Sequence, residues 1–412
     1  MNWLARRFEL SRHGDGQNLR PMEGLRGWAV FLVFLVHYST LAHPWVEGHA
    51  ALAQWSAALH TIGNTGVDLF FVLSGYLIYG SLLGRRQRFG KFMWRRVQRI
   101  YPAFLAVFAV YLGASLLSPA NSRIPQALPQ ALLYLGQNLL LLPGLFPIEP
   151  MITVAWSLSY EMFYYLALPA VIGVLGLRHR DPRWRCVFFL LLTAAVPVAC
   201  NLLGGGPIRL TMFMAGILLH EALPQSRIPT PGSVLGVLGL LVGMTAPLLP
   251  SPNSVTYALK VLTVYAGFFV LCLACFRDAA APLPRLLCWT PLRWLGNMSY
   301  SYYLVHGLAL KLGFLVLAKL LPPTGQEAWV YAGLMLPMFA VTLPVSALLF
   351  LAVERPFSLA PAQPAPRCPT SAEVAAAALR ETAALASTCT VRRPARDGAA
   401  EGAAARGATR VE

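Results

Sequence analysis

Ionisable side chains inside apolar runs mark the places where this chain could do chemistry. They are His37 in LRGWAVFLVFLVHYS, Asp68 in GVDLFFVLSG, Glu161 in AWSLSYEMFYYL and His306 in NMSYSYYLVHG. A charge at membrane depth is costly, so such a residue is by default a functional hypothesis with a partner to be found. Histidine transfers protons near neutral pH, and a carboxylate can orient it. These four residues are our candidate catalytic groups.

Arg26 precedes His37 by eleven residues and lies near the start of the same apolar run. Eleven residues of α-helix turn by about 1100°, so both side chains lie on one face, about 16 Å apart along the axis. An arginine at the membrane edge could hold an anionic group while the histidine meets the far end of the same ligand. The alternative is a snorkelling arginine with a hydrogen-bonded core histidine, and the spacing favours neither.

The other candidates also have structural explanations. Asp68 is predicted near the outer start of its span, where it could orient a histidine, pair with an arginine or cap a helix. The aromatic residues around Glu161, including Trp156, are typical of an interfacial belt. His306 has a predicted depth that matches His37, although a lone histidine is more often a hydrogen-bonded structural residue.

The densest cluster of positive charge is the segment 85–99. Arg96 and Arg99 are three residues apart and share a helix face. Arginine clusters suit phosphate geometry, so the segment could dock a phosphorylated cytosolic molecule. The alternative is ordinary topology signalling with anionic lipid contact. No glycine-rich loop of the phosphate-binding type follows a strand, which argues against nucleotide hydrolases and Rossmann enzymes.

Long apolar helices must position these groups. Of the 412 residues, 57% are hydrophobic and 12% charged, whereas soluble domains are about 25% charged. This composition argues against a soluble enzyme, a coiled coil, a disordered protein and a nucleic-acid binder, despite the net charge of +16. A membrane helix needs about 20 mostly apolar residues. Ten segments fit: 27–43, 65–84, 100–118, 153–177, 186–203, 207–222, 232–250, 255–276, 296–320 and 329–353.

The lysines and arginines support this prediction of an all-α polytopic membrane protein. With the N-terminus in the cytoplasm, ten spans leave only Arg123 in an outer loop, as the positive-inside rule requires. We predict a cytoplasmic segment 1–26 and a transmembrane domain 27–357, whose first apolar run is a membrane helix and not a cleaved signal peptide. The Ala/Pro/Arg-rich segment 358–412 is predicted to be a disordered cytoplasmic tail. The stretch 130–142 is too short to span and could lie at the interface or re-enter, as part of a substrate site.

The seven cysteines predict no disulfide framework and no metal site. Cys272 and Cys275 are three residues apart, but no second Cys/His pair stands nearby. Buried thiols that behave as small apolar side chains are the better interpretation.

The ordered motifs resemble the acyltransferase-3 family of membrane acyltransferases, which includes O-antigen and exopolysaccharide O-acetyltransferases. The resemblance covers about 20–357. The matching segments are LRGWAVFLVFLVH with Arg26 and His37, GVDLFFVLSGYLIYG with Asp68 and Ser74, RRVQRIYP with Arg96 and Arg99, AWSLSYEMFYYL with Trp156, Ser157 and Glu161, LGNMSYSYYLVH with His306, and VERPF with Glu354 and Pro356.

The resemblance implies a multi-pass protein of the bacterial inner membrane that uses acyl-CoA, most commonly acetyl-CoA, as a cytoplasmic donor. It implies no tightly bound cofactor, and an acceptor hydroxyl on a carbohydrate or glycolipid at the extracytoplasmic side. It also implies that His37 is essential and that Arg26, Arg96 and Arg99 contact coenzyme A. Some relatives carry an additional periplasmic domain after the bundle, and this chain resembles the stand-alone form.

From these residues we expect His37 to act as general base, with Glu161 or Asp68 orienting it. Ser74, Trp156, Tyr303 or His306 are expected to shape the site and to donate to the oxyanion. The predicted catalytic residues are thus His37, Glu161, Asp68 and His306, and the predicted donor-binding residues are Arg26, Arg96, Arg99, Ser74, Trp156 and Tyr303. An acyl-histidine intermediate remains an alternative to direct transfer.

Two other function classes fit the same polar residues. One is a transporter or flippase that uses a mid-membrane His/Glu proton relay without catalysis. The other is a non-catalytic component of an export complex. Transporter halves often repeat, and no convincing repeat relates 27–203 to 207–353.

Overall fold

Helices make up nearly all of the regular structure. The computed structural model describes residues 2–10, 20–119, 122–203, 205–325 and 327–359. Within these ranges no strand occurs, and a single isolated bridge joins Pro143 to Phe146. The predicted tail 358–412 lies outside the described residues except for its first two. The all-α fold class is therefore confirmed for the described part.

Eight helical segments in the described ranges are long and apolar enough to cross a membrane, which confirms a polytopic membrane protein. They are α2 (Arg20–Val46), α3 (Ala50–Leu83), α4 (Phe89–Leu117), η2 with α6 (Thr153–Ala155 and Trp156–Val174), α7 (Pro182–Leu202), α10 (Ser254–Arg277), α13 (Ser299–Leu320) and α15 with the π-helix η6 (Met335–Leu349 and Phe350–Ser358).

The remaining helices are shorter. Two of them coincide with predicted spans, namely α8 (Thr211–Ala222) and α9 with η5 (Ser233–Thr245 and Ala246–Leu248), so eight rather than ten segments reach spanning length. The others are α1 (Asn2–Phe8), α5 (Leu128–Leu139), η3 (Leu177–His179), η4 (Ile208–Leu210), α11 (Pro282–Leu287), α12 (Thr290–Asn297) and α14 (Ala328–Gly333). Helix α5 corresponds to the stretch predicted to be too short to span.

The prediction for the start of the second span was wrong. Helix α3 begins at Ala50 rather than near residue 65, so Asp68 lies 18 residues, or about 27 Å of helix, beyond its start. The first half of α3 contains His60 and Asn64, which weaken the apolar signal on which the prediction depended. Asp68 is therefore a mid-helix residue and cannot be an N-terminal cap.

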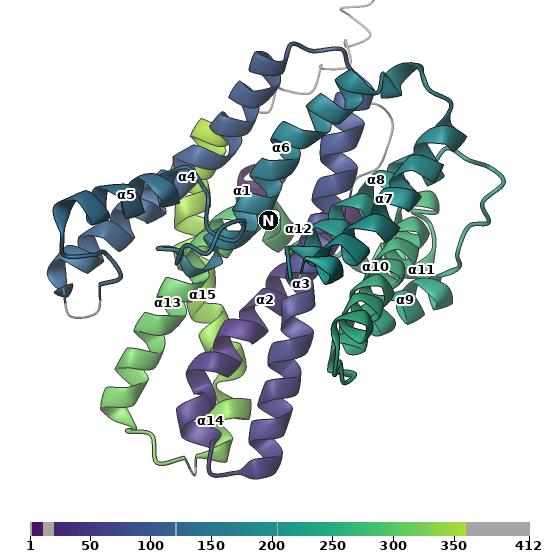
Figure 1. Cartoon of the computed structure of the whole chain (residues 1–412). Coiled ribbons are helices and arrows are strands. Elements are labelled where there is room, and N and C mark those ends of the chain that lie inside the picture. Colours follow the sequence, from purple (N-terminus) through teal and green to yellow (C-terminus); the bar gives the residue numbers. More distant parts are fainter. Residues whose placement is uncertain (1, 11–19, 120–121, 204, 326, 360–412) are drawn as a thin grey trace, which may run out of the picture. The chain divides into compact units, whose positions relative to one another are not determined.

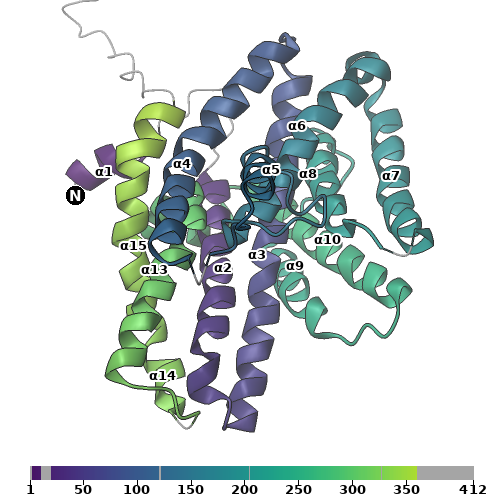
Figure 2. The same cartoon turned by 60° about the vertical axis from the view of Figure 1, so that its left-hand side comes forward.

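Glycines allow α3 to approach its neighbours closely. Gly63 and Gly66 face the backbone of α2 at Leu32 and Ala29, and Gly75 faces Gly216 across the crossing of α3 with α8. Small residues permit such close packing of membrane helices. Figures 1 and 2 show α2 and α3 side by side, with α13 and α15 on one side of them and α7, α8 and α10 on the other.

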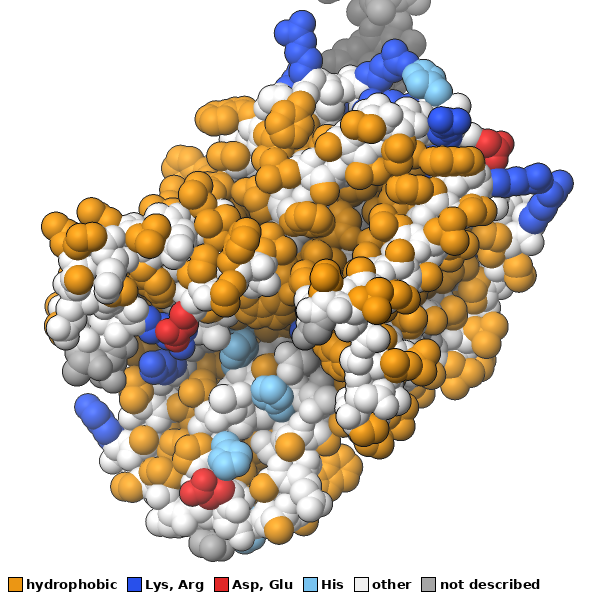
Figure 3. All heavy atoms as spheres, in the orientation of Figure 1, with side chains coloured by type: hydrophobic (Ala, Val, Ile, Leu, Met, Phe, Trp, Pro, Cys, Tyr) orange, Lys and Arg blue, Asp and Glu red, His pale blue; other side chains and the backbone are white. Residues whose placement is uncertain are grey.

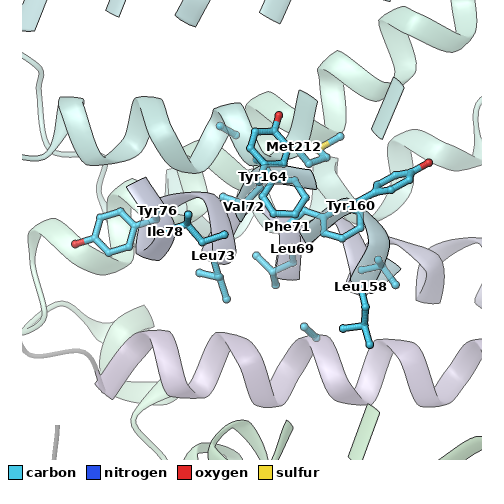
Figure 4. Close-up of a cluster of buried hydrophobic side chains, with 14 of the residues drawn as sticks. Leu69, Phe71, Val72, Leu73, Tyr76, Ile78, Leu158, Tyr160, Tyr164 and Met212 are labelled. Carbon is cyan, nitrogen blue, oxygen red and sulfur yellow. The ribbon is translucent and has the colours of Figure 1, made fainter. Parts of the chain in front are cut away.

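A stack of aromatic rings fixes α3 against α6 and α8. The ring of Phe71 lies 4.7 Å from Phe213, and Phe213 lies 4.2 Å from Tyr164, both in stacked geometry. Tyr160 contacts the same Phe71 ring at 5.6 Å. Figure 4 shows Phe71 between the tyrosines of α6. These contacts hold the α3 and α6 residues that form the site described below.

The surface fits a lipid environment. Hydrophobic side chains cover much of the face in Figure 3, whereas lysine and arginine gather mainly at one end. Soluble monomers rarely expose apolar patches of this extent. We call the end that carries the loop 84–88 and the turn 177–181 the basic end, because it holds Arg85, Arg86, Arg88, Arg178 and Arg180.

The crossing of α3 with α8 gives a stability prediction. A Cβ atom added at Gly216 would clash with the carbonyl oxygen of Val72 and the amide nitrogen of Tyr76. We expect Gly216→Ala to destabilise the protein by about 1–3 kcal/mol, because the two helix backbones must move apart. Thermal unfolding in detergent measures this change.

Gly113→Ala is the matched control, because that helical glycine has no atom within 4 Å of an added Cβ. The control should leave the melting temperature unchanged or raise it, since alanine favours helix over glycine. Equal melting temperatures for both variants would contradict the close packing.

Candidate active site

Helices α2, α3, α4, α6 and α13 enclose a pocket of about 870 Å3, its mouth included. Six of the ten predicted site residues line it. They are Arg26, Ser74, Arg96, Arg99, Glu161 and Tyr303, and the apolar lining residues include Val67, Phe70, Phe71 and Leu158. The structure thus brings together residues that are up to 277 positions apart in the sequence.

Three arginines form a cationic part of this pocket. Arg26 donates from Nη2 to the Ser299 hydroxyl at 2.7 Å and from Nε to the Gly296 carbonyl at 3.3 Å. Arg96 lies over the rings of Phe92 and Tyr165, with 4.9 Å and 5.1 Å from its guanidinium carbon to the ring centroids. These contacts fix the guanidinium groups, so a bound anion does not have to order them.

Arg99 is held by a carboxylate that is fully buried. Its Nη1 lies 2.9 Å from Oε1 of Glu354. The contact is an ion pair, because its geometry does not meet the criteria of a hydrogen bond. The other carboxylate oxygen of Glu354 accepts from the Ser301 hydroxyl at 2.6 Å and from its amide at 3.0 Å. Glu354 belongs to the π-helix η6, a type of helix frequent at functional sites. This carboxylate therefore ties η6 and α13 to the pocket.

Glu161 supplies a negative charge within the same pocket. Its Oε1 accepts from the Tyr165 hydroxyl at 2.7 Å and from the Ser74 hydroxyl at 3.4 Å. Tyr165 and Glu161 are one turn apart on α6, whereas Ser74 comes from α3. The carboxylate therefore lies among hydroxyl donors and arginines, and not in contact with His37.

The two ends of the pocket differ in the charge of the side chains that line them. Arg96 and Arg99 come from the first turns of α4, which begins at the basic end, and Arg26 lies two turns from the start of α2. Farther from that end along α3 and α6 the lining is mostly apolar, with Phe70, Phe71 and Leu158 beside the hydroxyl groups of Ser157 and Tyr303. A ligand with an anionic end and an apolar end would fit in one direction only.

His37 and His306 lie together beyond the apolar end and do not line the pocket. Their ring centroids are 4.9 Å apart at an interplanar angle of 64°. Tyr303, one helical turn before His306, lines the pocket and places its ring 6.3 Å from the His306 ring. His37 is half-buried, whereas His306 has no exposed surface.

Backbone carbonyls determine the tautomer of His306. Its Nδ1 lies 2.8 Å from the carbonyl oxygen of Tyr302 and 3.0 Å from that of Tyr303. Carbonyl oxygens only accept, so Nδ1 carries the hydrogen and the neutral ring keeps a lone pair on Nε2. Within the described residues this buried Nε2 has no hydrogen-bond partner. The Tyr302 ring stacks on the imidazole at 5.0 Å and fixes its plane.

Asp68 pairs with an arginine rather than with a histidine. Arg209 of η4 donates from Nε to the Asp68 carboxylate at 2.8 Å and from Nη2 to the Asn64 carbonyl at 2.9 Å. The guanidinium carbon lies 5.3 Å from the Trp156 ring centroid. Of the three roles that the sequence left open for Asp68, pairing with an arginine is the one this geometry shows. Trp156 lies at this ion pair and not in the pocket lining.

Arg209, Phe70 and Ser299 were not among the site residues predicted from the sequence. Arg209 was visible as a cation at the start of an apolar segment, but nothing in the sequence indicated its partner. Phe70 lies in a uniformly apolar run, so no local signal distinguishes it from a residue that faces lipid. Ser299 gave no signal of its own.

The described residues offer no metal site, because no group of three or more His, Cys, Asp or Glu side chains lies close enough together to hold an ion. The five cysteines in these ranges are free thiols, and Cys272 and Cys275 are buried as predicted.

Comparison with known proteins places these residues within a family. The profile of the family described as the acyltransferase domain, acyltransferase-3, matches residues 21–351. Acyltransferase MdmB of Streptomyces mycarofaciens is 26% identical over 371 residues, covering 82% of this chain and 91% of the relative. No solved structure matches this chain.

Two further relatives are longer proteins. The putative peptidoglycan O-acetyltransferase YrhL of Bacillus subtilis is 26% identical over 324 residues, covering 69% of this chain and 47% of the relative. O-acetyltransferase OatA of Staphylococcus aureus is 26% identical over 326 residues, covering 70% and 50%. This chain therefore spans about half the length of these two relatives.

The pair of Asp68 and Arg209 gives a testable prediction. We expect Asp68→Asn to destabilise the protein by about 3 kcal/mol, because it leaves a largely buried guanidinium without its counter-charge. The double variant Asp68→Asn with Arg209→Met should recover most of that loss. Thermal unfolding of the two single variants and the double variant measures the coupling.

If Asp68 is instead indispensable for chemistry, the double variant regains stability and still lacks activity. Additive losses of stability in the double variant would contradict the ion pair itself.

Proposed function

We propose that this chain, which belongs to the acyltransferase-3 family of membrane acyltransferases, transfers an acyl group, acetyl in the first instance, from acyl-CoA to a hydroxyl group of a carbohydrate or glycolipid. The donor would bind from the cytoplasm, and the acceptor would approach from the other side of the membrane. The observation that carries this proposal is the pocket with an arginine-rich end and an apolar end, followed by two histidines.

The charges at the basic end support a phosphorylated donor. Arg26, Arg96 and Arg99 can contact phosphate oxygens, for which the planar guanidinium is well suited. A second cleft at the basic end is lined by Arg86, Arg88, Arg178 and His179 among others, which adds positive charge outside the pocket. A coenzyme with several phosphates and a thioester at its far end fits this arrangement.

The positive-inside rule supports the proposed direction. The loop 84–88 and the turn 177–181 concentrate arginines at one end of the bundle, and such loops face the cytoplasm. An acyl-CoA donor, which the cytoplasm would supply, would then reach the pocket from this end. The acyl group would then move outward through the bundle, while the coenzyme remains at the basic end.

In the proposed reaction the acceptor oxygen attacks the carbonyl carbon of the thioester while His37 takes the hydroxyl proton. The tetrahedral intermediate collapses, the carbon–sulfur bond breaks, and the CoA thiolate leaves. His37 then gives up its proton to the thiolate or to solvent. Hydroxyl and guanidinium donors at the pocket, such as Ser74, would stabilise the oxyanion. The acyl group ends on the acceptor oxygen as an ester.

His306 is assigned a different role from the oxyanion donor expected from sequence. Its Nδ1 hydrogen is engaged by two backbone carbonyls, so the neutral ring can only accept through Nε2. We assign His306 as the residue that orients His37, because its ring lies 4.9 Å away and is itself held by Tyr302. Glu161 and Asp68 have other partners in the structure, so Glu161 is assigned to the donor pocket.

The acceptor class is proposed from the relatives. Two of them are named as O-acetyltransferases, one of them putatively of peptidoglycan. A carbohydrate hydroxyl is therefore the acceptor class proposed for this chain.

Acyl transfer from labelled acetyl-CoA tests the proposal. Purified protein in nanodiscs should transfer label to a glycan acceptor, whereas His37→Ala should lose about 100-fold or more of kcat as a general base is removed. Arg26→Ala should raise the KM for the donor with a smaller effect on kcat, because it removes a phosphate contact.

Lys319→Ala is the matched control, because this exposed cation lies in the last turn of α13 and lines neither cavity. Wild-type protein that moves an acceptor across the membrane without consuming acetyl-CoA would contradict the proposal and favour a transporter. Label trapped on His37 in the absence of acceptor would replace direct transfer by an acyl-histidine route.

The role of His306 gives a separate prediction. His306→Phe keeps an aromatic ring against Tyr302 but removes both nitrogens, so kcat should fall by about 100-fold while the donor KM stays unchanged. His306→Gln, which retains an acceptor, should recover part of the rate. If both variants lose donor binding and thermal stability together, His306 is merely structural.

A further inference from the structure

We propose that Phe70 and Tyr303 form the wall that limits the length of the transferred acyl chain, and that they restrict the donor to short acyl groups such as acetyl and propionyl. This inference rests on the proposed function, since it takes acyl-CoA as the ligand of the pocket. It adds the acyl-chain length that the same site accepts, which neither the sequence motifs nor the relatives define.

The two rings face each other at the apolar end of the pocket. Phe70 comes from α3 and Tyr303 from α13, and their centroids are 6.2 Å apart in an edge-to-face arrangement. Both residues line the pocket. His306 follows Tyr303 by one helical turn, and its ring lies 6.3 Å from that of Tyr303. The two rings therefore lie at the end of the pocket that is nearest to the two histidines.

Hydrogen bonds hold the tyrosine in place. The Tyr303 hydroxyl lies 2.8 Å from the Ser157 hydroxyl and donates to the Val154 carbonyl at 3.1 Å. The Ser157 hydroxyl lies 3.1 Å from the same carbonyl, and since it has a single hydrogen it donates either to this carbonyl or to the Tyr303 oxygen. Since rotation of the ring would break this buried set of bonds, Tyr303 is the fixed side of the wall.

Phe70 is the adjustable side of the wall. It is half-buried and its ring has no polar anchor, whereas the neighbouring Phe71 is buried within the stack of aromatic rings that joins α3 to α6 and α8. Replacing Phe71 would disturb the core of the bundle. Replacing Phe70 mainly changes the space at the end of the pocket.

The polarity of the pocket directs the acyl group toward this wall. Phosphates that contact Arg96 and Arg99 point the thioester toward Val67, Phe70 and Leu158. An acyl chain too long for the remaining space would hold the carbonyl carbon back, away from His37. Discrimination by one methylene group in an apolar pocket is typically on the order of tenfold or more.

Comparing acetyl-CoA with butyryl-CoA tests the inference. Wild-type protein should favour acetyl-CoA in kcat/KM by on the order of 100-fold, since butyryl is longer by two methylene groups. Phe70→Ala replaces a phenyl ring by a methyl group and leaves space for those methylenes. It should raise the ratio of butyryl to acetyl kcat/KM by on the order of tenfold or more.

Phe163→Ala is the matched control, because this phenylalanine of α6 is 41% exposed and does not line the pocket. It should leave the selectivity unchanged. Phe70→Leu is the second variant, in case the alanine variant does not fold, and it should shift the ratio in the same direction by a smaller factor.

The outcomes separate this inference from the proposed function. Acetyl transfer by the wild type with an unchanged ratio in both Phe70 variants overturns the wall and leaves the function intact. The absence of any acyl transfer by folded wild-type protein overturns the function. A wild type that accepts butyryl-CoA as well as acetyl-CoA also overturns the wall.

Discussion

The structure depends on a requirement of the lipid environment, which is that a charged side chain at membrane depth must be paired or face a polar cavity. Each buried charge described here meets it. Arg209 pairs with Asp68, Arg99 with Glu354, and Arg185 with Glu221, and each pair joins segments far apart in the sequence. Arg26, Arg96, Arg99 and Glu161 line one and the same pocket. The candidate site is therefore a polar cavity lined by charged side chains.

Helix α3 connects these features. It is the longest helix of the described part, and it supplies Asp68 to one ion pair and Ser74 to the pocket. Its glycines allow α2 and α8 to approach on different faces, so that Arg26 and the aromatic stack are both within reach of the same helix. The close packing and the chemistry thus share one element. A change that separates α3 from α8 would also displace Phe71 and the apolar end of the pocket.

Much of the fold was predictable because apolar length and charge asymmetry are local signals. The spans around His37 and His306 were found in this way, and the helical period placed Arg26 and His37 on one face. The beginning of α3 was missed, since polar residues in its first half, such as His60 and Asn64, weaken the local apolar signal. The Asp68 pair and the His306 tautomer depend on Arg209 and on backbone carbonyls brought close by folding, which no spacing in the sequence encodes.

The central claim is that acyl-CoA enters from the basic end with its thioester directed toward the two histidines. The most direct measurement is a density map of the protein in nanodiscs with bound acetyl-CoA. Our account predicts phosphate density at Arg26, Arg96 and Arg99, with the acyl carbon at the apolar end beside Phe70. Coenzyme density outside this pocket, or with the thioester at the arginines, would contradict it.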